Sequence, residues 1–286
     1  KEAEALFVAQ KAFEDGFYDV SLGLLGRFLK SYPNSPKTAE VSLLIGQCYF
    51  HQNKFLEALA QFEGLLNQPA AKPIKDALLY WMAEVHFKGN SFEQAALYYK
   101  RIVDEFPQSG YLASAYYSLG WCLFQQQKFS QALDYFKIVE EKFPKEPQVK
   151  DTAFKIIECL YNLKDYAALK QKAKSYLKNY AKDAPGLAYL NFYMAEADYY
   201  LNNFNDAIDE YAKVLANKGD EKIQALAKLG AAWSNLKLKR YKEAQDNFAE
   251  IRMEALEKRS QCVLMLGKAI LMAETNRFNE AGAIYQ

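Results

Sequence analysis

The sequence lacks any long apolar run and any excess of charge of one sign. No stretch reaches the ~18 consecutive apolar residues that a membrane-spanning helix needs. The first ten residues, KEAEALFVAQ, contain neither the basic nor the apolar part of a signal peptide. The 36 Lys and Arg residues balance 35 Asp and Glu residues, so no overall field attracts nucleic acid or an anionic membrane. We therefore expect neither a nucleic-acid partner nor a membrane span within this sequence.

Histidine and cysteine are also scarce. The only histidines are His51 and His86, and none of the four cysteines is in CxxC spacing. This pattern predicts neither a zinc site nor a redox pair, and we expect no cofactor. With 13 Gly and 8 Pro in 286 residues, of which 51% are hydrophobic, the composition is that of a folded protein with a substantial core.

A period of 37 residues runs through the whole sequence. One column holds mostly small residues, each 37 or 38 residues after the last: Ser21, Ala58, Ala95, Ala132, Leu169, Ala207, Ala244 and Ala281. Three residues before each member lies an aromatic residue: Tyr18, Phe55, Phe92, Phe129, Tyr166, Phe204, Tyr241 and Phe278. A fixed period of this length predicts a solenoid of repeated units.

Each repeat predicts two amphipathic helices. Residues 117–127 and 129–143, for example, carry apolar residues at three- and four-residue spacing on either side of a short polar turn. A second small column marks where the two helices approach closely: Ala9, Gly46, Ala83, Gly120, Ile157, Ala195, Ala232 and Ala269. The second helices end at joints such as SYPNSP (31–36), EFPQSG (105–110) and KFPKEP (142–147), because Pro cannot continue a helix.

The order small residue, aromatic, Ala, aromatic, Pro resembles the tetratricopeptide repeat, whose late aromatic is matched by Phe62, Tyr99, Phe136, Tyr211, Phe248 and Tyr285. The resemblance implies an all-α fold, a right-handed α-solenoid of antiparallel helix hairpins with seven full repeats and a truncated eighth. We expect a single domain, with repeats at about 2–38, 39–75, 76–112, 113–149, 150–187, 188–224, 225–261 and 262–286. A hairpin cut short exposes an apolar face, so we expect a longer protein or a homo-oligomer formed through the open C-terminal end.

The repeats depart from the family pattern in two ways. The period exceeds the family's 34 residues by three, and the surplus lies in the joints. Joints of this kind are similar to those of bacterial cell-envelope members, such as the lipoprotein of the outer-membrane β-barrel assembly machinery and the periplasmic protein that works with the Tol–Pal system. That similarity implies the periplasm or cell envelope, with the cytoplasm as the alternative. In the fifth repeat Ile157, Leu169 and Ala173 break the size pattern, so we expect the stack to bend or loosen there.

Members of this family bind a protein or peptide along the first helices, at positions two, five, nine, twelve and thirteen. Here those positions are markedly aromatic, and large amphipathic aromatics are typical interface anchors. The residues expected to contact a partner lie in repeats three to seven: Tyr80, Glu84, Tyr117, Trp121, Phe154, Glu158, Phe192, Glu196, Tyr200 and Trp233. For each aromatic the alternative is packing between repeats, as we expect for Phe50, Phe87 and Phe124.

Three functional hypotheses follow. The favoured one is a non-enzymatic scaffold in a bacterial envelope assembly, which binds its partner in the concave groove. The alternative is an assembly adaptor that acts through its convex face or its ends. A helical-toroid hydrolase would need paired carboxylates, but Glu84, Glu158 and Glu196 recur at one ninth position on a face expected to be solvated.

The ninth position also restricts the kind of ligand. Chaperone-binding members of the family hold a free C-terminal carboxylate with Lys, Arg and Asn, including an Asn at that position. The residues here are Gln10, Gln47, Glu84, Trp121, Glu158, Glu196, Trp233 and Ile270. We therefore expect an extended peptide, a helix or a folded domain, and not a free acidic C-terminus.

Overall fold

The computed structural model describes residues 1–180, 186–217 and 220–284, the side chain of residue 284 excepted. Within these ranges the chain is helical with short connections and contains no strand, which confirms the all-α fold. Tyr285, expected as the late aromatic of the eighth repeat, lies outside the described residues. None of the described helices combines the length and apolarity that crossing a bilayer requires.

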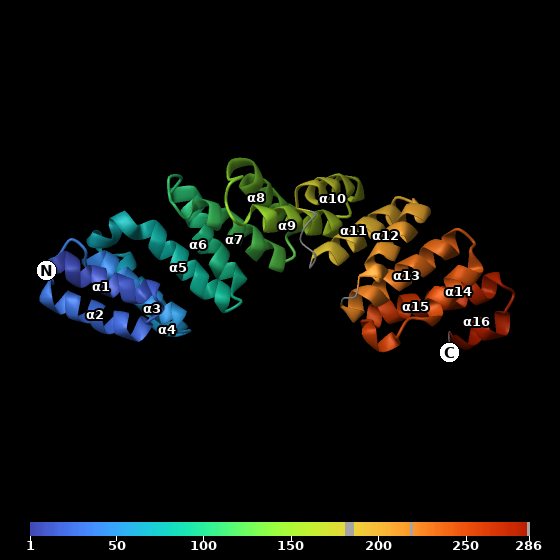
Figure 1. Ribbon diagram of the computed structural model, residues 1–286, viewed down its shortest axis with the longest axis horizontal. Helices are drawn as coiled ribbons and strands as arrows, with labels where there is room; N and C mark the ends of the chain where they lie inside the picture. Colours follow the sequence, from blue (N-terminus) through green and yellow to red (C-terminus); the bar gives the residue numbers. More distant parts are fainter. Residues whose placement is uncertain (181–185, 218–219, 285–286) are drawn as a thin grey trace. The chain divides into compact units, whose positions relative to one another are not determined.

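Consecutive helices pair into antiparallel hairpins (Figure 1). The first helices are α1 (Glu2–Glu14), α3 (Thr38–His51), α5 (Lys75–Lys88), α7 (Leu112–Gln125), α9 (Val149–Asn162), α11 (Leu187–Tyr200), α13 (Glu221–Lys237) and α15 (Lys258–Glu274). The second helices are α2 (Tyr18–Ser31), α4 (Phe55–Leu66), α6 (Phe92–Glu105), α8 (Phe129–Lys142), α10 (Tyr166–Tyr180), α12 (Phe204–Ala216), α14 (Tyr241–Ala249) and α16 (Phe278–Ile284). Short 3-10 helices, Pro69–Ile74 and Met253–Ala255, precede α5 and α15. Every second helix begins at the periodic aromatic, as the sequence predicts.

The helices fall into two compact units, a first unit of Lys1–Thr152 and a second unit of Ala153–Gln286. That the whole chain forms a single domain therefore stays a prediction. The boundary falls inside α9, at the start of the fifth repeat. In that repeat Ile157, Leu169 and Ala173 are all fully buried. The large Ile157 and Leu169 stand where other repeats have small residues between the two helices, and the small Ala173 stands where they have a late aromatic.

The hairpin cores are built from the two periodic columns. Phe62 and Phe136, both late aromatics, are fully buried against the glycines of the first-helix column. A Cβ added at Gly120 would lie 2.8 Å from Cε1 of Phe136, and one at Gly46 would overlap the ring of Phe62. The helical glycines are therefore required by close packing, which the sequence predicted.

One left-handed residue recurs in the turn between the two helices of every described hairpin. Its φ is between 57° and 80°, and the residues are Gly16, Asn53, Asn90, Gln127, Lys164, Asn202, Lys239 and Asn276. The following N–H donates to the carbonyl five residues earlier at 2.7–3.0 Å, as in Arg240 to Asn235, which is the Schellman arrangement. Gly and Asn tolerate this φ, whereas Gln and Lys do so only with strain.

Lys239→Gly should therefore stabilise the second unit by about 0.5–1 kcal/mol, because the relief of left-handed strain exceeds the added entropy of the unfolded chain. The matched control is Lys242→Gly in α14, an exposed helical lysine, which should destabilise by about 1 kcal/mol. Denaturant midpoints of the two variants check this. Destabilisation by Lys239→Gly would mean that the turn is not strained.

Two of the Pro-containing joints are tied to the first helix of their own repeat. Ser109 donates to the Asp76 carboxylate at 2.6 Å, and its Oγ accepts the N–H of Tyr111 at 3.0 Å. Ser35 makes the same pair of contacts, with the carboxylate of Glu2 and the N–H of Lys37. The serine thus fixes the entry into the next hairpin.

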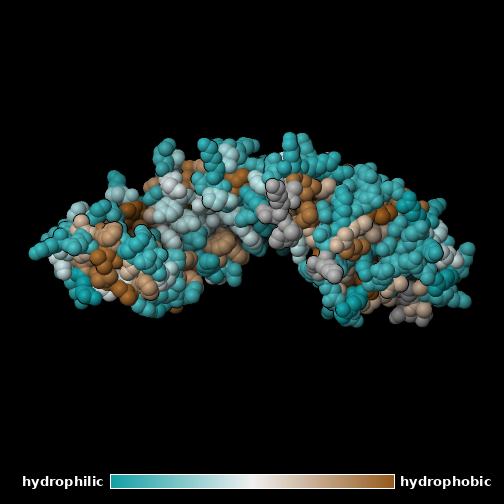
Figure 2. Space-filling view, viewed as in Figure 1, coloured by the Kyte–Doolittle hydropathy of each residue, from teal (hydrophilic) through white to brown (hydrophobic). Residues whose placement is uncertain are grey.

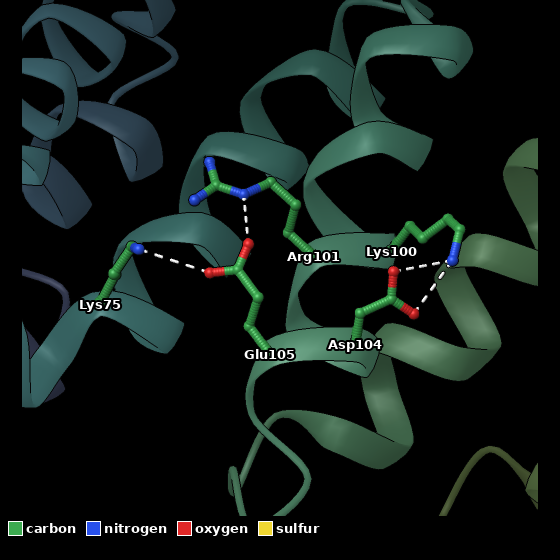
Figure 3. Close-up of polar contacts among 5 residues, drawn as sticks. All are labelled: Lys75, Lys100, Arg101, Asp104 and Glu105. Carbon is green, nitrogen blue, oxygen red and sulfur yellow. Dashed lines mark hydrogen bonds and ion pairs between the residues drawn. The ribbon is translucent and has the colours of Figure 1, made fainter.

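Charged residues on the surface of the first unit pair along and between helices (Figure 3). Glu105, at the end of α6, accepts from Arg101 Nε at 2.8 Å and faces Lys75 Nζ at 3.4 Å, while Lys100 pairs with Asp104 at 2.7 Å. These side chains are more than a third exposed, so each pair contributes about 0–1 kcal/mol. Figure 2 shows hydrophilic residues over much of the face that it draws, with hydrophobic patches among them.

Candidate partner-binding groove

A groove of about 780 Å³ lies in the second unit, lined mainly by α11, α13 and α15, with Tyr161 from α9. Four of the ten predicted contact residues line it: Phe192, Glu196, Tyr200 and Trp233. Further lining residues were not predicted, among them Tyr189, Leu226, Leu229, Val263 and Leu266. These five occupy position two or five of a first helix, where the family places ligand contacts, so they are found when residues of every type at those positions are included. The groove, named here the aromatic groove, extends into the eighth repeat.

The aromatic groove presents unusual amounts of exposed apolar surface. Tyr200 is 53% exposed, Leu266 44% and Val263 38%, although each is a large hydrophobic residue on a helix. Tyr200 is held by stacking on Tyr166, with ring centroids 4.7 Å apart and an interplanar angle of 9°. Phe192, in contrast, is only 8% exposed and belongs largely to the core. The exposed residues are therefore the better anchors for a partner.

Polar groups lie at the rim of the aromatic groove. Tyr189 donates to Asp220 at 2.7 Å, and Lys222 pairs with Glu257 at 2.5 Å. Among the described residues, Arg259 has no ion-pair partner. An apolar floor with a charged rim is the usual make-up of a protein-binding surface.

Glu196 is the acidic group inside the aromatic groove. Its carboxylate accepts from the phenol of Tyr211 at 2.5 Å and from that of Tyr161 at 3.3 Å. Burial raises the pKa of Glu196 above its ordinary value, and the two phenol hydrogen bonds partly oppose this shift. No Lys, Arg or His of the described residues lies within ion-pair distance of it.

The same arrangement occurs at Glu84 in the first unit. Glu84 accepts from the buried phenol of Tyr99 at 2.5 Å and lines a pocket of about 410 Å³, the Glu84 pocket, with Tyr80, Trp81 and Phe50. Burial, and then the charge of Glu84, raise the pKa of Tyr80 and of Tyr99 well above their ordinary value. The expectation that these glutamates lie on a solvated face is therefore wrong, because each accepts hydrogen bonds from tyrosines.

The pairing follows from the late aromatic of the same repeat. Where that aromatic is Tyr99 or Tyr211, the ninth position is Glu84 or Glu196, whereas repeats with a late Phe carry Gln47, Trp121 or Trp233 there. A buried phenol needs an acceptor and a buried phenyl ring does not. In these five repeats the two columns vary together, whereas the fifth repeat has Glu158 with Ala173 and the eighth has Ile270 with Tyr285.

The remaining predicted residues lie outside both sites. Tyr117 packs on Phe136 at a centroid distance of 5.9 Å, and Trp121 contacts Phe87 and Phe124 edge-on. Phe154 packs against Tyr176 and Tyr193, and Glu158 accepts from Tyr193 at 3.3 Å and pairs with Lys155 at 2.7 Å. A partner-binding role for these four residues stays a prediction.

A groove of similar size, about 760 Å³, lies between second helices in the first unit. This α6–α8 groove has α7 as its floor and is lined by Leu97, Leu123, Tyr135 and Ile138, among others. Leu97 is 58% exposed. The α6–α8 groove lies on second helices, where the convex-face alternative places its contacts.

Three of the four cysteines are buried, where a thiol is a poor nucleophile. Cys48, Cys122 and Cys159 are buried, and burial raises the pKa of Cys122 and of Cys159 to about 12, so both stay protonated. Cys262 is exposed, and all four thiols are free. In the part of the chain that the structure describes, no group of three His, Cys, Asp or Glu residues could hold a metal ion.

Two models of the tetratricopeptide repeat family match the sequence, one over residues 9–73 and the other over residues 76–109 and 114–146. The chain contains tetratricopeptide repeats. These repeats are generally protein–protein interaction modules, and their fold is typically a non-enzymatic scaffold. No curated protein matches the chain in sequence.

Solved structures extend the likeness of the fold over most of the chain. The C-terminal part of a TPR repeat-containing protein from Cytophaga hutchinsonii is 16% identical with a TM-score of 0.66, covering 91% of this chain and 99% of that one. A tetratricopeptide repeat protein from Parabacteroides merdae ATCC 43184 is 15% identical with a TM-score of 0.56, covering 93% and 98%. YrrB, described as a TPR protein with an unusual peptide-binding site, is 16% identical with a TM-score of 0.58, covering 70% and 96%. At these identities the likeness is one of fold.

Proposed function

We propose that this tetratricopeptide repeat chain is a non-enzymatic docking protein that binds a segment of a partner protein in the aromatic groove. The observation that carries the proposal is the exposure of Tyr200, Val263 and Leu266 within one groove of the second unit. Apolar side chains left open to water in a concave surface are a common feature of interaction sites. Tetratricopeptide repeat proteins bind proteins or peptides, which supports the same conclusion.

A second candidate is an adaptor that binds through the α6–α8 groove. Leu97 favours it, since this leucine is more exposed than Leu266 and lines a groove of nearly equal volume. The two leucines allow one substitution to be tested at both places.

Leu266→Lys should abolish partner capture, because a lysine there places a charge on the apolar floor of the aromatic groove. Loss of a central apolar anchor reduces affinity by roughly 30-fold or more. The measurement is quantitative mass spectrometry of proteins captured by the immobilised chain from extracts of the source organism.

The matched control is Leu97→Lys, the same change at an exposed leucine of the α6–α8 groove. Proteins captured by the wild type and by Leu97→Lys, but lost with Leu266→Lys, support the aromatic groove. The reverse pattern overturns it in favour of the adaptor. Circular dichroism of both variants verifies that the helices remain.

We further propose that the protein works in a bacterial cell envelope, as part of an assembly there. The support is the similarity of joints such as SYPNSP (31–36) and EFPQSG (105–110) to those of envelope members of the family. Fractionation of the source organism with an antibody to this chain tests the location, and recovery in the cytosol alone contradicts it.

A further inference from the structure

We infer that the aromatic groove recognises one basic side chain, an Arg or Lys of the partner segment, at the carboxylate of Glu196. The apolar side chains of the same segment then lie on Val263 and Leu266. This inference rests on the proposed function and names the chemistry of its ligand.

The first argument is the unbalanced charge of Glu196. A carboxylate offers about four acceptor sites, and the phenols of Tyr211 and Tyr161 use two of them without supplying a positive charge. Glu196 also lines the aromatic groove, so it remains within reach of a ligand. A partly buried charge is normally paired, and a guanidinium or ammonium group would complete the pair.

The second argument is the aromatic surroundings of this carboxylate. Tyr161, Phe192, Tyr199 and Tyr200 line the groove with it. Burial, and then the charge of Glu196, raise the pKa of Tyr161 and of Tyr200, so its negative potential extends over both phenols. Ring faces and a carboxylate together attract a cation more strongly than either alone.

The third argument comes from the fifth repeat, where the chain supplies the cation itself. Glu158 occupies the same ninth position as Glu196, and Lys155 pairs with it at 2.7 Å. Both side chains are less than a fifth exposed. In the fifth repeat a ninth-position glutamate thus holds a lysine ammonium, whereas Glu196 has no such partner among the described residues.

The rim of the groove limits the number of basic residues. Lys222 is neutralised by Glu257, whereas Arg259 has no ion-pair partner in the described part of the chain. Burial and then the charge of Glu196 raise the pKa of the Tyr200 phenol, and the nearby positive charge of Arg259 partly opposes this rise. A second positive charge beside the first would be repelled there, so the groove favours a single basic residue over a polybasic segment.

The experiment is a selection of random dodecapeptides on the immobilised chain, followed by titration of one selected peptide by fluorescence anisotropy. The same peptide is made with citrulline in place of its Arg, or norleucine in place of its Lys. Both peptides are titrated against the wild type, Glu196→Gln and Glu243→Gln. Gln at 196 keeps a carbonyl to accept from Tyr211, while Glu243→Gln removes an exposed carboxylate of α14 that does not line the groove.

We expect selected peptides to carry one basic residue among apolar ones. Glu196→Gln should weaken binding of the basic peptide roughly 10- to 100-fold and leave the neutral peptide unchanged, while Glu243→Gln has little effect on either. Two outcomes overturn this inference and leave the proposed groove standing. Either the selected peptides lack a basic residue, or they bind Glu196→Gln as tightly as the wild type but no longer bind Leu266→Lys. Failure to select any peptide above the level captured by Leu266→Lys overturns the groove and the inference together.

Discussion

Gly46→Ala should destabilise the first unit by about 2–3 kcal/mol, the opposite of the usual effect of replacing a helical glycine. The added Cβ would lie within 2.8 Å of three carbons of the Phe62 ring. That ring is fully buried, so α3 and α4 must separate to accept even one methyl group. Overpacking of this kind typically costs 1–3 kcal/mol. The measurement is the urea midpoint, with hydrogen exchange in α3 and α4 to locate the loss.

Gly64→Ala is the matched control within the same hairpin. Gly64 lies in α4, and nothing lies within 4 Å of a Cβ built there. The substitution should stabilise by about 0.5–1 kcal/mol, because Ala has the higher helix propensity. If both variants shift stability in the same direction, close approach of α3 to α4 does not explain the choice of glycine.

Tyr211→Phe should destabilise the second unit by about 2 kcal/mol at neutral pH. The phenol is fully buried and donates to the carboxylate of Glu196, so its loss leaves a partly buried charge with one donor fewer. Tyr241→Phe is the control, since Tyr241 donates to Glu274 at 3.0 Å on the surface, where water replaces the lost donor. It should change stability by less than about 0.5 kcal/mol. Denaturant titrations of both variants give the comparison.

The deficit of Tyr211→Phe should also grow from acid to neutral pH. Burial already raises the pKa of Glu196 in the folded state, and the Tyr211 hydrogen bond lowers it, so the variant raises it further. A carboxyl whose folded pKa is raised contributes stability at low pH that is lost as the pH rises through that pKa. The other titratable groups in its field are phenols whose pKa is raised by burial and that stay neutral over this range: Tyr161, Tyr166, Tyr199 and Tyr200. A deficit equal at pH 4 and pH 7 contradicts this account.

The sequence predicts the hairpins well because their periodic residues act locally. Each second helix begins at the periodic aromatic, and the late aromatics Phe62, Tyr99 and Tyr211 are buried as expected. The left-handed turn residue was not predicted, since Lys164 and Lys239 give no turn signal of the kind that Gly16 or Asn53 gives. At these positions the hydrogen bonds of the turn fix the left-handed backbone conformation, whatever the side chain.

Contacts between repeats are harder to predict. Gly230 and Gly267 lie two residues before the small first-helix column, and a Cβ at either would overlap Tyr211 or Phe248 of the preceding repeat. Glu196 likewise serves tyrosines of two different helices, Tyr161 and Tyr211. Such positions depend on how neighbouring hairpins pack, which a period along one chain does not specify. Exposed groove residues such as Leu266 were not predicted, because the expected contacts were aromatic and acidic residues only.

The recurring left-handed turn allows whole hairpins to be duplicated or deleted without a change in the turn that joins their helices. Since Asn53, Asn90 and Gln127 hold the same backbone at the same place in their repeats, a 37-residue segment that starts at one of them ends just before the next. Duplication or deletion of such a segment joins one turn to an identical turn, so the splice itself introduces no new loop. A gene encoding this chain can therefore gain or lose whole hairpins in single recombination steps, and the number of hairpins becomes a property that selection can adjust one repeat at a time.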